Sequence, residues 1–161
     1  MKAHFVMMAK YNSWANARLY RMAGTLPDEQ YRRDVGAYFK SLHGTLNHLL
    51  ATDRIWMRHL TGTGDHPAKL NAIVFDDLPS LTAARQEEDA RIINFVQDLT
   101  ELRLEEMWEY RALNGTLQRQ QRRAILAHLF NHQTHHRGQV HCMLTQAGGK
   151  PHDTDLQYMP E

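Results

Sequence analysis

Cysteine is almost absent from this sequence of 161 residues, which contains a single one, Cys142. One thiol excludes an intramolecular disulfide and every zinc module that needs several cysteines. Long apolar runs are missing as well, because no stretch approaches the ~20 residues that a membrane-spanning helix needs. The opening stretch MKAHFVMMAKYNSW is interrupted by Lys10 and Asn12, which is atypical of a secretory leader. We therefore expect a cytoplasmic protein that does not enter a membrane.

An excess of charge of one sign is also lacking. Nineteen Lys and Arg against eighteen Asp and Glu leave a formal net charge of +1, so no global field attracts nucleic acid or an anionic membrane. We interpret the short basic cluster QRQQRR, residues 118–123, as the solvated start of a helix and predict no nucleic-acid partner.

Several sequence motifs of known metal and nucleotide sites are absent too. They are H-E-x-x-H, a Walker loop, G-x-G-x-x-G and the paired Glu-x-x-His of ferritin-like di-iron proteins.

Four segments have the apolar spacing of amphipathic helices. They cover residues 3–23, residues 37–60, a segment from Pro79 or Ser80 to about residue 99, and residues 120–146. Residues 62–78 have the composition of a crossover connection, and the tail after Gly148 has that of an extended chain. Alternation around Asn114-Gly115 predicts a β-hairpin in which both turn positions favour positive φ. The sequence thus predicts one all-α domain, residues 1–161, folded as a four-helix bundle with a short β-hairpin between the third and fourth helices.

Polar residues interrupt the apolar stripes of the first three helices at Asn12, Asn16, Asp53 and Glu88. Burying such a group costs roughly a few kcal/mol unless it is hydrogen-bonded or paired. One interpretation is a satisfied buried network, with Arg85 or Arg91 as the partner of Glu88 by helical proximity. The other is a polar pocket enclosed by the bundle.

Histidine is the residue type that stands out, with eleven in the chain and a concentration in the fourth helix. His128, His132 and His136 follow one another at intervals of four and form one row on the helix, flanked by His135 and Gln139. Imidazoles one turn apart can reach the same divalent ion, and neutral imidazole is the commonest protein ligand of zinc and its neighbours. The spacing leaves open whether the ligand pair is the first two or the last two of the row.

A ligand from another helix is needed, because two side chains do not hold a metal tightly. The second helix offers His43, His48 and His59. Helical periodicity does not select His48, which lies about 120° from the apolar stripe beside Thr45 and Thr52. That position is compatible with the edge of a polar pocket and equally with the surface.

Three segments together resemble the DinB family of metal-dependent helical bundles: YNSWANARLY, GTLNHLLATDRIWMRHL and HLFNHQTHHRGQVHCMLTQAG. The resemblance covers nearly the whole chain. Carried over to these motifs, the family's ligand set is His48 with His132 and His136, which leaves His128 and His135 as packing or supporting residues. The resemblance further implies a pseudo-symmetric four-helix bundle and a homodimer packed through helices.

A three-histidine site leaves an open coordination position, as in catalytic metal sites. We expect zinc or nickel, with iron or manganese as alternatives. The resemblance implies a small-molecule substrate and a metal-dependent S-transferase that uses a low-molecular-weight thiol, or a hydrolase. The alternative is a non-catalytic, stress-associated bundle with a structural ion. A polar pocket lined by Asn12, Asn16 or Asp53 would favour the enzyme, for which Asp53 and Glu88 are the available carboxylates. We expect Cys142 to be a buried, inert thiol.

Overall fold

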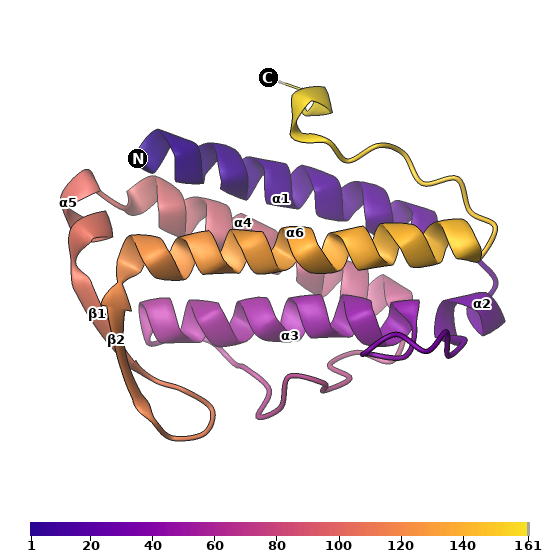
Figure 1. Ribbon diagram of the computed structural model, residues 1–161, viewed down its shortest axis with the longest axis horizontal. Coiled ribbons are helices and arrows are strands. Elements are labelled where there is room, and N and C mark those ends of the chain that lie inside the picture. The colour runs from indigo at the N-terminus through magenta and orange to yellow at the C-terminus, as the bar shows by residue number, and fades with distance from the viewer. Residues whose placement is uncertain (161) are drawn as a thin grey trace.

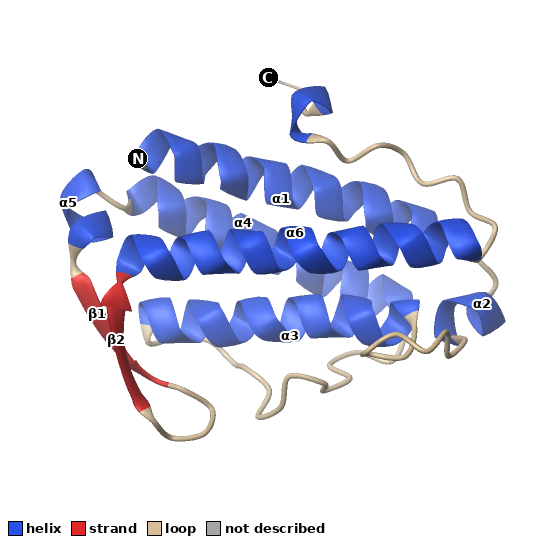
Figure 2. Cartoon of the chain, in the orientation of Figure 1, coloured by secondary structure: helices blue, strands red, loops and turns tan. Residues whose placement is uncertain are grey.

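The computed structural model describes residues 1–160 and is mostly helical, with one small antiparallel sheet (Figures 1 and 2). Its elements are α1 (Lys2–Ala23), α2 (Asp28–Arg32), α3 (Leu42–Thr61), α4 (Leu78–Asp98), α5 (Glu101–Glu105), β1 (Met107–Arg111), β2 (Leu117–Gln121), α6 (Arg122–Gln146) and the 3-10 helix η1 (Leu156–Tyr158). No helix within this part of the chain is both long and apolar enough to cross a bilayer.

The four long helices lie side by side (Figure 1). Helix α1 packs on α4 and α6, and α3 packs on the same two helices. The β1–β2 hairpin lies at one end of this group and α2 at the other, while the tail after α6 turns back along α1 (Figure 1). The Tyr11 hydroxyl on α1 donates a hydrogen bond of 2.8 Å to the carbonyl of Thr154 and holds that tail in place.

The predicted second helix begins five residues too early. Residues 35–41 form a tight loop instead, in which Lys40 has a left-handed backbone with φ of 68°. Helix α3 starts directly after it, where the Ser41 hydroxyl accepts a hydrogen bond from the Gly44 N–H at 3.1 Å and caps the helix. The apolar spacing typical of a helix continues into residues 37–41. The sequence pattern therefore did not show that the helical backbone begins only at Leu42.

Two short helices, α2 and α5, were not predicted, and the hairpin turn differs from the expected one. Gly115 alone of the two central residues has positive φ, 83°. The Gly115 N–H donates to the Ala112 carbonyl at 2.8 Å, and the Ala112 N–H donates to the Thr116 carbonyl at 2.9 Å. This three-residue connection needs one left-handed glycine, whereas the predicted two-residue turn would have needed two such positions.

The core has two apolar clusters with a polar layer between them. One cluster contains Leu19, Leu46 and Leu81, and the other contains Phe5, Met57 and Leu126, among others. Between them every long helix contributes polar residues from its middle turns, all at most 6% exposed: Asn12, Asn16, Asp53, Arg85, Glu88, Asp89, Gln133 and Arg137. The polar residues that interrupt the apolar stripes of the separate helices therefore form one continuous layer in the folded molecule.

Arg85 on α4 is the centre of this layer. Its guanidinium contacts the Asp53 carboxylate at 2.7 Å and the Asp89 carboxylate at 3.0 Å, with all three side chains buried. Burial raises the pKa of Asp53 to about 6 and raises that of Asp89, while the positive charge of Arg85 opposes both shifts. One buried cation thus holds two carboxylates in the core.

The asparagines complete the layer from α1. The Asn12 and Asn16 side-chain amides each donate to the Asp89 carboxylate at 3.1 Å. On α6 the buried Arg137 donates to the Asn12 carbonyl oxygen. These contacts support the interpretation of a buried hydrogen-bonded network, because both asparagine NH2 groups and the Asn12 carbonyl oxygen have partners. The Asn16 carbonyl oxygen has none among the described residues.

Glu88 pairs with one of the two arginines that the sequence suggested as its partner. Its carboxylate accepts from Arg91 at 2.9 Å. The other suggested partner, Arg85, is engaged by Asp53 and Asp89 instead. Spacing along the helix was enough to suggest Arg91 as the partner of Glu88. It could not predict the partners of Arg85, because Asp53 belongs to another helix that packs against α4.

Replacing Gly44 by alanine is expected to destabilise the fold. A Cβ atom at this position would lie 2.0 Å from the Phe39 carbonyl oxygen, so the 35–41 loop would have to move away from α3. We expect a loss of about 1–3 kcal/mol in the free energy of unfolding, measured by urea denaturation. Gly138 is the matched control, because a Cβ there meets nothing within 4 Å and Gly138→Ala should stabilise α6 by about 0.5–1 kcal/mol. Equal stability of the two variants would contradict the close approach at Gly44.

Candidate metal centre

The structure brings His48, His132 and His136 together at the seam between α3 and α6. One ring nitrogen of each lies within 4.8 Å of those of the others. Ring centroids are separated by 5.1 Å for His48 and His132, and by 4.5 Å for His132 and His136. His48 is almost fully buried and the other two are half-buried. Within residues 1–160 this group has three members, so a metal bound there would retain open coordination positions.

Hydrogen bonds fix the tautomers of two of the three rings. The His48 Nδ1–H donates to the Leu70 carbonyl at 2.7 Å, and the His136 Nδ1–H donates to the Gln139 side-chain carbonyl at 2.7 Å. In a neutral imidazole the other nitrogen then carries a lone pair. Both Nε2 atoms are therefore ready to accept a metal ion, in the arrangement by which supporting hydrogen bonds orient histidine ligands.

The third ring completes a donor set that fits a divalent cation. The His132 Nε2 lies 3.1 Å from the His48 Nε2, and the buried His132 Nδ1 has no hydrogen-bond partner within the described chain. Burial lowers the pKa of His48 to about 4 and that of His132 to about 3, and it also lowers the pKa of His136. All three imidazoles are thus neutral near pH 7, the form that binds metal.

A buried hydrogen bond sets the two helices in register beside the cluster. The Gln133 side-chain amide on α6 donates to the Leu49 carbonyl on α3 at 3.1 Å. Gln133 follows His132 directly in the chain, as Leu49 follows His48. The bond therefore fixes the height and rotation of α6 at which the two imidazoles meet. His136 lies one turn further along, so the same register brings it to His48 as well.

Phe39 covers the cluster from the loop before α3. Its ring stacks on that of His48 with centroids 3.7 Å apart, and meets that of His136 edge-on at 5.6 Å. On α3, the Thr52 hydroxyl lies 3.3 Å from the His48 Nδ1. Sequence reasoning missed both Phe39 and the Leu70 carbonyl. An aromatic residue next to a helix start is a weak signal for Phe39, and a backbone carbonyl in a crossover segment gives none.

The remaining candidate histidines lie outside the cluster. The His43 Nε2 is 3.3 Å from the Phe75 carbonyl, and His59 packs against the ring of Tyr110. His128 is exposed and meets Trp56 edge-on, so the first pair of the row is not the one that meets His48. His135 accepts a hydrogen bond from Gln139, which supports His136 in turn.

The expectation for Cys142 was wrong, and the polar pocket that would favour an enzyme does not lie over the histidines. Cys142 is exposed, not buried, because it lies on a face of α6 whose neighbouring residues Gly138, Thr145 and Gln146 are exposed as well. The carboxylates of Asp53 and Glu88 are held by arginines in the polar layer, and Asn12 and Asn16 are bonded to Asp89. These side chains do not form a polar pocket over the histidines. Asn16 instead lines a pocket of about 390 Å³ between α1 and α4, together with Arg85 and Asp89.

A small aromatic pocket of about 290 Å³ adjoins the cluster along α3. Thr52, which touches His48, lines it together with Trp56 and Tyr110, whose ring centroids are 5.6 Å apart. This pocket offers apolar surface for the body of a small molecule but no acidic group. It meets the cluster through Thr52 and Leu70, which line it and contact His48.

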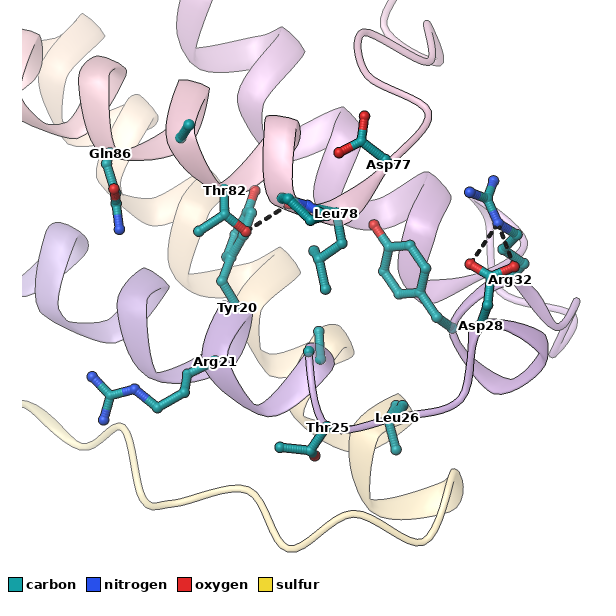
Figure 3. Close-up of a pocket in the computed structure, with 15 residues that line it drawn as sticks. Tyr20, Arg21, Thr25, Leu26, Asp28, Arg32, Asp77, Leu78, Thr82 and Gln86 are labelled. Atoms are coloured by element: carbon teal, nitrogen blue, oxygen red, sulfur yellow. Dashed lines mark hydrogen bonds and ion pairs between the residues drawn. The ribbon is translucent and has the colours of Figure 1, made fainter.

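Another pocket, of about 630 Å³, lies between the end of α1, α2 and the start of α4 (Figure 3). Three of its four charged side chains already have partners: Arg32 and Asp28 bind each other at 2.9 Å, and the Asp77 side chain caps α4 by accepting from Ser80 at 2.8 Å, while Arg21 also lines the pocket. No histidine or cysteine lines it. We therefore assign the candidate site to the histidine cluster and not to this larger hollow.

Comparisons with known proteins concern the sequence family and the fold. A model of the DinB family matches residues 1–161. The Protein DinB of Bacillus subtilis (strain 168) is 29% identical over 160 residues, which is 91% of this chain and 87% of that protein. The crystal structure of a DinB-like protein from Bacillus cereus ATCC 10987 superimposes with a TM-score of 0.67 at 17% identity, covering 86% of this chain and 89% of that one. At 17% identity, the similarity to the Bacillus cereus structure shows the fold alone.

Proposed function

The chain belongs to the DinB family, and from that premise we propose that His48, His132 and His136 bind a divalent metal ion at the centre of a metal-dependent transferase or hydrolase. The observation that carries the proposal is the pair of Nε2 atoms 3.1 Å apart, one of them with its tautomer fixed by the Leu70 carbonyl. Two lone pairs facing each other in a half-buried site repel unless a proton or a cation lies between them.

The family supplies the remaining parts of the proposal. We propose the four-helix bundle of the DinB type as the single domain of residues 1–161, assembled as a homodimer through its helices. Zinc or nickel is the metal proposed first, with iron or manganese as alternatives. The proposed substrate is a small molecule that reacts with a low-molecular-weight thiol.

An ion with three neutral imidazole ligands would supply an open position at which bound water or thiol has a lowered pKa. The chain itself orients the ligands: Leu70 and Gln139 hold the rings of His48 and His136 through their Nδ1–H groups. Phe39 excludes water from one side of the cluster by stacking on His48. The aromatic pocket at Thr52, Trp56 and Tyr110 would position the apolar part of a substrate.

A structural ion is the second candidate function. The burial of His48 beneath Phe39 favours it, because a structural site is closed to solvent. The group of three ligands favours the enzyme, since a closed zinc site takes a fourth protein ligand and none of the described His, Cys, Asp or Glu side chains joins this group.

Turnover is expected to depend on the metal and on the cluster. We expect the protein to accelerate the reaction between a low-molecular-weight thiol and an activated aryl halide, or the hydrolysis of an aryl ester, and a chelator should return either rate to the uncatalysed level. His132→Ala should do the same, whereas His128→Ala, which alters an exposed residue of the same row, should retain the rate. Full metal content without turnover in either assay would support the structural ion. Turnover that survives both the chelator and His132→Ala would contradict a role of the cluster in the reaction.

A further inference from the structure

A second pocket borders the histidine cluster, and Leu70 and Leu113 line both it and the aromatic pocket. It has a volume of about 750 Å³, which is within the range of small-molecule sites. We call it the loop pocket, because the 35–41 loop, the segment after α3 and the hairpin loop form its walls. Its lining includes Tyr38, Phe39, Lys40, Lys69, Ile73 and Leu113.

The loop pocket is linked to the candidate metal centre through two shared walls. Phe39 lines the pocket and stacks on the ring of His48. Leu70 also lines the pocket, and its carbonyl accepts the hydrogen bond from the His48 Nδ1. A molecule in the pocket would therefore lie against residues that touch the cluster.

The charge of the loop pocket has one sign. Lys40 and Lys69 line it, and no acidic residue does. Neither lysine takes part in an ion pair within residues 1–160. Like charges at a cleft with apolar walls focus the field and attract a counter-ion of opposite charge. The apolar walls here are Tyr38, Ile73 and Leu113, which the structure leaves exposed.

Lys40 is held in an unusual backbone conformation. It is the one non-glycine residue with positive φ in residues 1–160. Its N–H donates to the Ala37 carbonyl at 2.7 Å, and its carbonyl accepts from the Val35 N–H at 2.8 Å. Below it, the loop lies so close to α3 that Gly44 has no room for a Cβ. Non-glycine residues in this region are strained, and such strain collects at binding sites where the surroundings fix it.

From these observations we propose that the loop pocket binds a small organic anion, with its acidic group held by Lys40 and Lys69 and its apolar body against Tyr38, Ile73 and Leu113. Binding of the anion is independent of the metal. Its role as substrate rests on the function proposed above, since only a working metal centre would make the bound molecule react. The fixed backbone of Lys40 sets the point on the loop from which its side chain reaches the pocket, while the ammonium group stays on a flexible stem that can adapt to the position of the acidic group.

The test compares an aromatic carboxylate with its uncharged amide on protein freed of metal. Metal is removed with a chelator, the chelator is removed by gel filtration, and 1-naphthoate or 1-naphthamide is titrated by calorimetry. We expect 1-naphthoate to bind about tenfold more tightly than 1-naphthamide, a difference of about 1.4 kcal/mol. The double substitution Lys40→Asn with Lys69→Gln should remove that advantage and leave the amide unaffected. Asparagine is chosen because it tolerates the left-handed region.

The control removes the same number of charges elsewhere. Lys10→Gln with Lys150→Gln changes two exposed lysines outside the pocket and should preserve the preference for naphthoate. Equal binding of acid and amide to the unaltered protein, or equal losses in the two double variants, would overturn the proposal. The same titration on metal-free His132→Ala should give unchanged naphthoate affinity. Failure of the metal centre and failure of the anion site are thus separate results.

Discussion

Arg85→Met is expected to destabilise the protein by about 3–5 kcal/mol at pH 8, because removing one partner of a buried ion pair leaves an uncompensated charge. The substitution leaves Asp53 and Asp89 buried without the cation that contacts both carboxylates. Burial already raises the pKa of both groups, and removal of the arginine raises them further. Urea denaturation at constant temperature measures the change in the free energy of unfolding.

The same change should depend on pH in a defined direction. A carboxyl group with a raised pKa binds more protons in the folded state than in the unfolded state, so stability falls as pH rises through that pKa. In the variant the two carboxyl groups are protonated in the fold up to a higher pH than in the unaltered protein. The loss caused by Arg85→Met is therefore expected to be smaller at pH 5 than at pH 8.

An exposed arginine provides the control for this prediction. Arg32 also contacts two aspartates, Asp28 and Asp76, but their side chains are 75% and 84% exposed. Arg32→Met should cost less than about 1 kcal/mol, as for surface ion pairs in general. In the buried site, Asp53→Leu combined with Arg85→Met should recover part of the stability, because the double change removes one of the stranded charges. A loss no larger than that of Arg32→Met would contradict the description of the polar layer.

The helices could be predicted from the sequence because their apolar spacing is regular over many turns. The first helix, 3–23, differs from α1 by one residue at its start. The start of α3 could not be predicted, since the loop that replaces its expected first turn depends on contacts of Lys40 with Val35 and Ala37. The turn at Gly115 was assigned the wrong type for a similar reason: Asn-Gly favours a hairpin, but the number of residues in the connection depends on the strand pairing.

The candidate site was predictable in part, and the limit lies in what a helical wheel represents. A wheel places His48 away from the apolar stripe, yet His48 is 3% exposed. Helix α3 is buried on this side by Phe39 and by the segment around Leu70, which do not belong to any helix. The motif resembling the DinB family selected His48 where periodicity could not. Supporting groups such as the Leu70 carbonyl could not be predicted from the sequence, because they belong to the backbone of an irregular segment.

The polar layer and the histidine cluster lie at the same level of the fold. On α6, Gln133 and Arg137 point into the layer, while the preceding residues, His132 and His136, point to the seam with α3. Polar partners in a core are more selective about register than apolar ones, since a shift of one residue leaves them unpaired. The layer thus favours the one alignment of α6 in which the imidazoles meet His48.

Loss of bound metal is the largest change expected from a single substitution at the cluster. Protein purified without an affinity tag should contain about one divalent ion per chain by elemental analysis, and His132→Ala close to none, because two remaining imidazoles hold a metal weakly. The His132 Nε2 lies 3.1 Å from the His48 Nε2. Zinc added at about 1,000 times its dissociation constant should also raise the free energy of unfolding by about 4 kcal/mol in the unaltered protein, through preferential binding to the folded state.

The neighbouring histidine separates this result from a general effect of altering α6. His128 lies on the same row, exposed, with its ring 6.0 Å from that of His132. His128→Ala should therefore retain both the ion and the stabilisation by zinc. In the absence of zinc, His132→Ala should remain folded, since the site is half-buried and the polar layer beneath it is unchanged. Undiminished metal content in His132→Ala, or equal loss in both variants, would show that the three imidazoles do not form the binding site.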